Sequence, residues 1–285
     1  MKKLLFLLDT DPFPSVFDTV VAYDGGADRV AGYANVTPDT VGPLVDGTIF
    51  TRGGKDKQNT AIFVGGGDMA KGEALFAAVK KKFFGPFRVS AMLDSNGSNT
   101  TAAAGVALLA KAGKLKGKKA VVLAGTGPVG MRAAAFLGQE GAEVSLTSRS
   151  KERADNAAKA VETRFGVKVT PVQAADDAAR GQAVKDAQIV FAAGAIGCQL
   201  LKASDWQNNP NLELLADVNA QPPLGIEGVE AIDKGKDRSG KRVFGALGIG
   251  GLKLKLHRSC IGQLFESSEG VLDAEAIYAL AKEMA

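Results

Sequence analysis

The glycine-rich segment from Gly125 to Gly130 constrains the fold more than any other part of this chain. It directly follows a predicted strand, 119–124, and precedes a helix-like segment, 131–139. A strand–turn–helix context is what the G-x-G-x-x-G pattern needs to bind a dinucleotide, because the three glycines allow a tight turn, close approach of the pyrophosphate, and packing of helix on strand. The sequence predicts that the phosphates lie on Gly125, Thr126, Gly127, Pro128, Val129 and Gly130, the alternative being a purely structural turn.

The residues after the next predicted strand, 143–147, indicate which dinucleotide is bound. Enzymes that use NAD usually place a carboxylate at this point to hold the ribose diol. Here Ser148 and Arg149 take that place, and Lys151 and Arg153 follow. A hydroxyl and a guanidinium suit the 2′-phosphate of NADP, which a carboxylate would repel. We therefore predict an NADP site that includes these four residues. The alternative is that they are surface charges at the start of a helix.

Two more loops follow predicted strands of the same sheet. Small residues, Ala193, Gly194 and Ala195, come after the strand 188–192, and would let the nicotinamide ribose and ring lie against the sheet edge. Asn219 and Gln221 come after the strand 212–218. Open α/β sheets bind ligands at the carboxyl ends of their strands. We expect the three small residues and Asn219 to contact the cofactor, and Asn219 and Gln221 to contact the substrate.

Strand-like and helix-like segments alternate along the whole chain, which predicts an α/β fold with a Rossmann-type, doubly wound parallel sheet. The earlier part predicts a second α/β domain, with strands at 4–8, 60–64 and 87–93 and a helix at 69–82 that Asp68 caps. A helical tail from about Gly251 should pack back on this first domain. The predicted division is a substrate domain, 1–112 plus 251–285, and an NADP-binding domain, 113–250, with a cleft between them.

Composition excludes several other classes of protein. The net charge is +4, and the one dense basic run, 111–119, is typical of a solvated linker, so nucleic-acid binding is not favoured. Two cysteines and one histidine offer no metal-ligand spacing, and the thiols fit a reducing compartment, the cytoplasm. The apolar run 4–8 is too short for a signal peptide or a membrane span.

Two polar segments are candidates for binding a substrate. Asp94, Asn96 and Asn99 follow a predicted strand and could bind a polar heterocycle, or could cap the next helix. Lys253 and Lys255 follow a run of glycines at the predicted start of a helix, where positive charge opposes the helix dipole. That conflict indicates a functional lysine. The two side chains point about 200° apart on an ideal helix, so both cannot face one site; alternatively both are solvated.

Over its whole length the chain resembles the bacterial NADP-dependent methylene-tetrahydromethanopterin dehydrogenases of one-carbon metabolism. The segments that carry the resemblance are 23–28, 45–49, 63–69, 83–89, 94–101, the glycine turn, 219–226 and 245–257. The resemblance implies oxidation of methylene-tetrahydromethanopterin, and often of methylene-tetrahydrofolate, to the methenyl form with NADP. It also implies a catalytic lysine, which corresponds to Lys253, and a homo-oligomer, expected to be a trimer, with no membrane or nucleic-acid partner.

Other interpretations stay open at this point. Related folate enzymes that also hydrolyse the methenyl product carry a Tyr-x-x-x-Lys motif, which matches only Tyr278 to Lys282 here, so we expect no cyclohydrolase activity. An NADP dehydrogenase of the shikimate or quinate type would need a Lys–Asp pair, for which Asp94 with Lys55 or Lys57 is available. A non-catalytic NADP-sensing module is the third interpretation.

Overall fold

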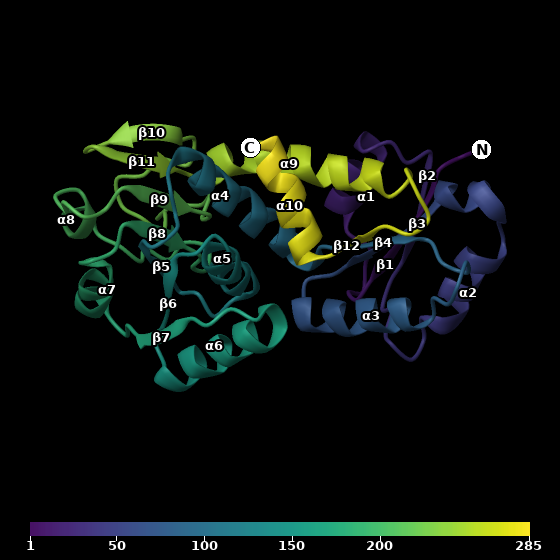
Figure 1. The fold of residues 1–285 in the computed structure, drawn as a ribbon, viewed down its shortest axis with the longest axis horizontal. Helices are drawn as coiled ribbons and strands as arrows, with labels where there is room; N and C mark the ends of the chain where they lie inside the picture. Colours follow the sequence, from purple (N-terminus) through teal and green to yellow (C-terminus); the bar gives the residue numbers. More distant parts are fainter. The chain divides into compact units, whose positions relative to one another are not determined.

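The computed structural model describes all 285 residues, which form two compact units (Figure 1). The first comprises Met1–Thr100 and Leu254–Leu280, and the second Thr101–Lys253 and Ala281–Ala285. The boundaries fall inside three helices, α4 (Ser98–Ala112), α9 (Ala246–Gln263) and α10 (Ala274–Met284). The functional division predicted above, with boundaries after residues 112 and 250, stays a prediction.

The first unit is built on a parallel sheet of five strands in the order β12-β4-β3-β1-β2. Helices α2 and α3 lie on one face, and α1 and the second half of α9 lie on the other (Figure 1). The elements are β1 (Leu4–Asp9), α1 (Val16–Asp24), β2 (Arg29–Tyr33), α2 (Gly42–Phe50), the 3-10 helix Gly54–Asn59, β3 (Thr60–Gly65), α3 (Met69–Lys81), β4 (Ser90–Leu93), the 3-10 turn Ser95–Gly97, β12 (Val271–Leu272) and α10 (Ala274–Met284).

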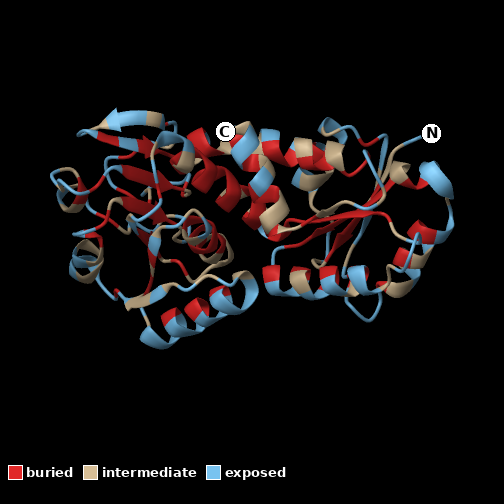
Figure 2. Ribbon diagram, in the orientation of Figure 1, coloured by how far each residue is buried: buried red, intermediate tan, exposed pale blue.

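Side-chain alternation in β1 and β3 builds a core on both faces of this sheet. Leu8, Ile62 and Val64 pack with apolar residues of α2 and α3, whereas Phe63 points to the other face and stacks on His257 of α9. Figure 2 shows the central strands as buried. The edge strand β2 differs, because four of its five residues are exposed.

The second unit contains a sheet of seven strands in the order β10-β11-β9-β8-β5-β6-β7. Only β10 is antiparallel to its neighbour. The six parallel strands have the order typical of a Rossmann fold, which confirms the predicted fold class. The elements are β5 (Lys119–Leu123), α5 (Pro128–Gln139), β6 (Glu143–Ser148), α6 (Lys151–Phe165), β7 (Thr170–Gln173), α7 (Asp177–Val184), β8 (Ile189–Ala192), α8 (Ala203–Trp206), β9 (Leu214–Asp217), β10 (Lys234–Arg238) and β11 (Lys241–Phe244).

The start of α9 was predicted wrongly. The helix begins at Ala246, not near Gly251, so the glycines expected to form a loop lie in its first turns. A methyl group on Gly248 would lie 1.9 Å from the carbonyl oxygen of Asp233, and one on Gly245 would lie 2.0 Å from that of Glu230. These glycines therefore allow the helix to start against the backbone of the segment 230–233.

The C-terminal tail returns to the first sheet, as predicted. The two-residue strand β12 pairs with β4 through Val271 and Leu272, and α10 follows it. The strand expected at 87–93 is shorter at its start, because Phe84 and Phe87 bridge to each other in a tight turn and β4 begins only at Ser90.

Candidate active site

The glycine turn joins β5 to α5, and each glycine has a distinct environment. A methyl group on Gly130 would lie 2.6 Å from the Cα of Gly125, so the third glycine lets the helix cross the start of the turn. A methyl group on Gly127 would meet nothing within 4 Å. Gly127 is the N-cap of α5, with Pro128 following it as the first helical residue. The turn thus leaves open space in front of a helix N-terminus, where phosphate binds well.

Thr147 of β6 holds this turn in place. Its hydroxyl accepts from the Ala124 N–H at 3.1 Å, and its carbonyl oxygen accepts from the Gly125 N–H at 2.9 Å. Ala124 has a left-handed backbone with φ of 51°, which costs a residue with a Cβ some strain. This supporting role could not be predicted from the sequence, because a threonine is also an ordinary residue in a strand.

The residues predicted to bind the 2′-phosphate lie at the end of β6 and the start of α6. Ser148 is the last residue of the strand and is 7% exposed, while Arg149, Lys151 and Arg153 are exposed. The Ser150 hydroxyl caps α6 by accepting from the Arg153 N–H. Lys151 pairs with Asp155 one turn later in the helix. Arg149 is therefore the exposed cation nearest the strand end.

The two loops after β8 and β9 are tied together by Asn219. This residue is 4% exposed, and its amide donates to the carbonyl oxygens of Ala195 at 3.4 Å and Pro223 at 3.3 Å. Its side-chain oxygen accepts from the Gln221 N–H at 3.2 Å. In the structure Asn219 shapes the loops, whereas the Gln221 side chain and Ala195 are exposed at the surface and Ala193 and Gly194 are partly buried.

Two buried carboxylates fix loops at the carboxyl ends of strands. Asp217 accepts from the N–H groups of Asn219 at 3.0 Å and Ile226 at 2.9 Å. Asp9 accepts from those of Asp11 at 2.9 Å and Ser15 at 3.0 Å. Burial raises the pKa of both carboxyl groups, and the backbone hydrogen bonds partly oppose the rise.

The polar segment after β4 divides into buried and exposed parts. Asp94 is fully buried, and its Oδ1 accepts from the N–H groups of Asn99 at 2.9 Å and Thr100 at 3.1 Å. Asn99 is also buried and donates to the Leu93 carbonyl oxygen at 2.6 Å. These contacts are the helix cap that the sequence left open as the alternative. Asn96, with φ of 54°, is exposed.

Apolar side chains are exposed just after β1. Phe13 is 83% exposed and Phe17, in the first turn of α1, is 50% exposed. Large exposed aromatic residues at the carboxyl end of a parallel sheet are typical of a ligand site. These two rings were not predicted as ligand contacts from the sequence, although their position after a predicted strand is a usable signal.

Lys253 lies in α9, which begins five residues earlier than predicted, at Ala246 rather than near Gly251. Seven residues of the helix precede it, so it is beyond the first turn and the predicted conflict with the helix dipole does not exist. Lys253 is half-buried and Lys255 is exposed. The difference in burial, rather than the dipole, now distinguishes the two lysines.

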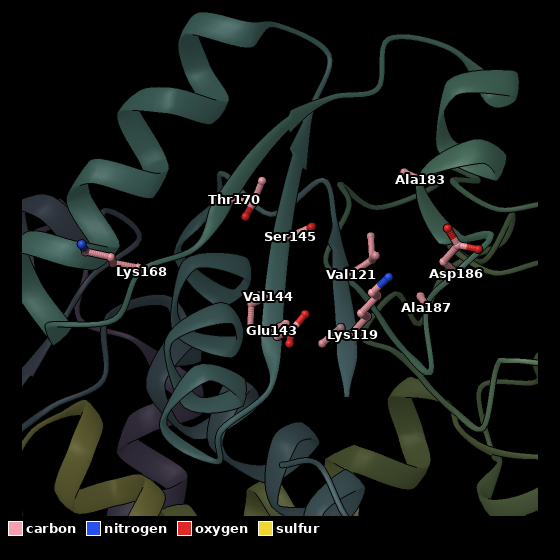
Figure 3. Close-up of a pocket in the computed structure, with 11 residues that line it drawn as sticks. Lys119, Val121, Glu143, Val144, Ser145, Lys168, Thr170, Ala183, Asp186 and Ala187 are labelled. Carbon is pink, nitrogen blue, oxygen red and sulfur yellow. The ribbon is translucent and has the colours of Figure 1, made fainter. Parts of the chain in front are cut away.

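The second unit also has an open hollow of about 520 Å³ (Figure 3). Lys119, Glu143 and Thr170 line it at the amino-terminal ends of β5, β6 and β7, and Lys168 and Asp186 lie at its rim. The glycine turn follows the opposite end of β5, so this hollow is separate from the predicted cofactor site.

No cluster of three or more His, Cys, Asp or Glu residues could hold a metal ion. None of the helices is long and apolar enough to cross a bilayer.

Comparison with known proteins decides the family. Residues 16–96 match the family model described as methylene-tetrahydromethanopterin dehydrogenase, N-terminal. The chain is 70% identical to the "Bifunctional protein MdtA" of Methylorubrum extorquens, over 100% of this chain and 99% of that protein. It is 34% identical, over the same shares, to the "NAD(P)-dependent methylenetetrahydromethanopterin dehydrogenase" of that organism. The chain belongs to the methylene-tetrahydromethanopterin dehydrogenase family.

Membership of this family confirms the resemblance predicted from the sequence and makes the chain an oxidoreductase of one-carbon metabolism. Solved structures show the fold more widely: a shikimate 5-dehydrogenase from Mycobacterium fortuitum matches with a TM-score of 0.54 and 14% identity, over 98% of each chain. Such identity supports the fold alone.

Lys57 and Asp94 form one of the two Lys–Asp pairs that a shikimate-type enzyme could use. The Lys57 ammonium donates to the Pro86 carbonyl oxygen at 2.5 Å and lies over the Phe87 ring, and Asp94 caps α4. Both side chains therefore have structural contacts within the first unit.

Proposed function

We propose that this dehydrogenase oxidises methylene-tetrahydromethanopterin, and also methylene-tetrahydrofolate, to the methenyl form with NADP. The observation that carries the proposal is the open glycine turn at the N-terminus of α5, in a chain of this family. NADP, when bound, accepts the hydride. The donor carbon lies between two nitrogens whose lone pairs stabilise the resulting cation, so no strong general base is needed.

The protein's task in such a reaction is to bind and orient the two reactants. The turn 125–130 binds the pyrophosphate, and Ser148, Arg149, Lys151 and Arg153 bind the 2′-phosphate. In the first unit, the exposed polar residue Asn96 and the exposed rings of Phe13 and Phe17 suit a flat, polar pterin. In the second unit, Gln221 is exposed and stays a predicted substrate contact. Asp94, Asn99 and Asn219 act by shaping the loops. Lys253 contacts the substrate and supports turnover.

Assays with four candidate substrates test the function. Pure protein with NADP should turn over methylene-tetrahydromethanopterin and methylene-tetrahydrofolate, followed by absorbance of NADPH, and should not hydrolyse the methenyl product. Turnover of shikimate or quinate alone contradicts the proposal. Tight NADP binding by calorimetry, without turnover of either pterin, favours a sensing module instead.

Arg149→Ala should weaken NADP binding by about 1–3 kcal/mol, the typical loss for a hydrogen bond to a charged group. The side chain is exposed, so the fold should be unaffected. Binding of NAD, which lacks the 2′-phosphate, should change little. Dissociation constants for both cofactors, measured by calorimetry at one ionic strength, check this. An equal loss for NAD and NADP contradicts the proposed contact.

We also propose a cytoplasmic homo-oligomer, expected to be a trimer. The exposed edge strand β2 and the exposed side chains of Val16, Val20 and Tyr23 on α1 support association, because open strand edges and apolar patches are usually covered. Both cysteines are free thiols, and Cys198 is exposed, which suits a reducing compartment. Light scattering after size-exclusion chromatography measures the subunit number.

A further inference from the structure

The one histidine of the chain, His257, is fully buried within the first unit. It lies on α9, and its ring stacks on Phe63 of β3 with centroids 5.5 Å apart and planes 18° apart. Phe17 of α1 packs near the same ring, at a centroid distance of 6.2 Å. The hydride transfer proposed above uses no histidine, so this residue requires another explanation.

Two carboxylates flank the imidazole ring on opposite sides. Nδ1 lies 4.0 Å from Oδ2 of Asp94, and Nε2 lies 4.0 Å from Oδ1 of Asp18. The Asp94 side chain is fully buried, and that of Asp18 is 13% exposed. Two negative charges held out of water on either side of a neutral ring would be costly. An imidazolium ion between them offsets both charges.

Asp94 has the contacts of an ionised carboxylate. It accepts from two backbone N–H groups and from the Thr100 hydroxyl at 2.6 Å. Cys260, three residues after His257 on α9, is also buried; burial and the negative charge of Asp94 raise the pKa of its thiol well above the usual range. Cys260 therefore stays a neutral thiol. On this side of α9, a protonated His257 ring, with Nδ1 4.0 Å from Oδ2 of Asp94, would supply the positive charge that balances this carboxylate.

The same half of α9 is docked firmly on α1. A methyl group on Gly25, just after α1, would lie 2.6 Å from the Cβ of Ile261, and the Arg258 guanidinium pairs with Asp24 at 2.7 Å. His257 adds a contact from α9 to both α1 and the end of β4. Lys253 lies four residues before it, on the same side of the helix.

We propose that His257 is a positioning residue: as an imidazolium ion between Asp94 and Asp18, it sets the rotation of α9 and hence the place of Lys253. The proposal rests on the role given to Lys253 in the proposed function. His257 itself touches neither substrate nor cofactor, because the ring is enclosed by Phe63, Phe17 and the two carboxylates.

Nitrogen-15 NMR tests the charge of the ring without reference to activity. Protein labelled at histidine shows a single imidazole, since the chain has one histidine. We expect both ring nitrogens to be protonated at pH 7, and the ring to lose its second proton at a lower pH in Asp18→Asn than in the unsubstituted protein. A neutral ring at pH 7, or no change on removal of the Asp18 charge, overturns the proposal.

Kinetics test the positioning role. His257→Gln should lower kcat by on the order of 10- to 100-fold, the cost of a small misplacement of a working group, with KM for NADP unchanged. In the unsubstituted enzyme kcat should also fall as pH rises and the ring loses its proton, and this limb should be missing in His257→Gln. The control is Arg258→Gln, which breaks the exposed pair next to it and should leave kcat within about twofold, because exposed ion pairs contribute little.

The outcomes separate this proposal from the proposed function. If His257→Gln fails to fold, Asp18→Asn replaces it and should lower kcat in parallel with the loss of the ring proton. Unchanged kcat in the folded variant overturns the positioning role. A loss of kcat in His257→Gln with none in Lys253→Ala overturns the link through Lys253. Absence of pterin turnover in the unsubstituted enzyme contradicts the proposed function and leaves the NMR result to decide the charge of His257.

Discussion

Gly127→Val should abolish NADP binding while the protein stays folded. The valine side chain would stand in the open space before α5, where the pyrophosphate must approach the backbone. The backbone at Gly127 has φ of −81° and ψ of 169°, a conformation open to any residue, so folding is not strained. We expect NADP affinity to fall by on the order of 100-fold or more, equivalent to about 3 kcal/mol.

Gly130→Val is the matched control for this substitution. It adds the same atoms three residues later, but against the backbone of Gly125 rather than into open space. That variant should be destabilised, with a lower midpoint of thermal unfolding, whereas Gly127→Val should unfold like the original protein. Calorimetry of NADP binding and circular dichroism of unfolding measure the two effects. Normal NADP affinity in Gly127→Val would remove the turn from the cofactor site.

Lys253→Ala should reduce turnover far more than it reduces NADP affinity. We expect kcat to fall by on the order of 100-fold, the size typical of removing a group that orients the reacting atoms, while the dissociation constant of NADP changes little. Lys255→Ala is the control, because this exposed lysine lies two residues along the same helix and points elsewhere. Steady-state rates with methylene-tetrahydromethanopterin check both variants, and equal rates for the two would exclude a special role for Lys253.

The position of the glycine turn in the fold could be predicted because its signals are local, while its contacts with a cofactor stay a prediction. The turn 125–130 lies between consecutive elements of one β-α-β unit, and Ser148 is the last residue of the next strand. Periodicity and spacing along the chain are enough to place such residues. The fold class follows from the same alternation, and the structure confirms it.

The local structure of the segments proposed to bind the substrate could not be predicted to the same degree, because it depends on contacts with residues distant in the sequence. Asp94 looked like a ligand, but the left-handed Asn96 turns the chain so that α4 starts at once and its N–H groups reach Asp94. The glycines before Lys253 looked like a loop, but they lie at the start of a helix, and backbone carbonyl oxygens of the segment 230–233 lie where side chains on Gly245 and Gly248 would be. Neither contact is visible in the spacing of the residues themselves.

The exposure of Arg149 beside the glycine turn has a consequence for how the coenzyme preference of this enzyme can change. The carbonyl oxygen of Ser148 accepts from the Ala174 N–H at 2.7 Å, so the Ser148 backbone contributes to the fold. The side chains of Arg149 and Arg153, in contrast, are exposed. Substitution of those exposed side chains should change the free energy of unfolding little. Substitutions at these surface positions alone can therefore change the preference between NADP and NAD, while the glycine turn that binds the pyrophosphate stays the same.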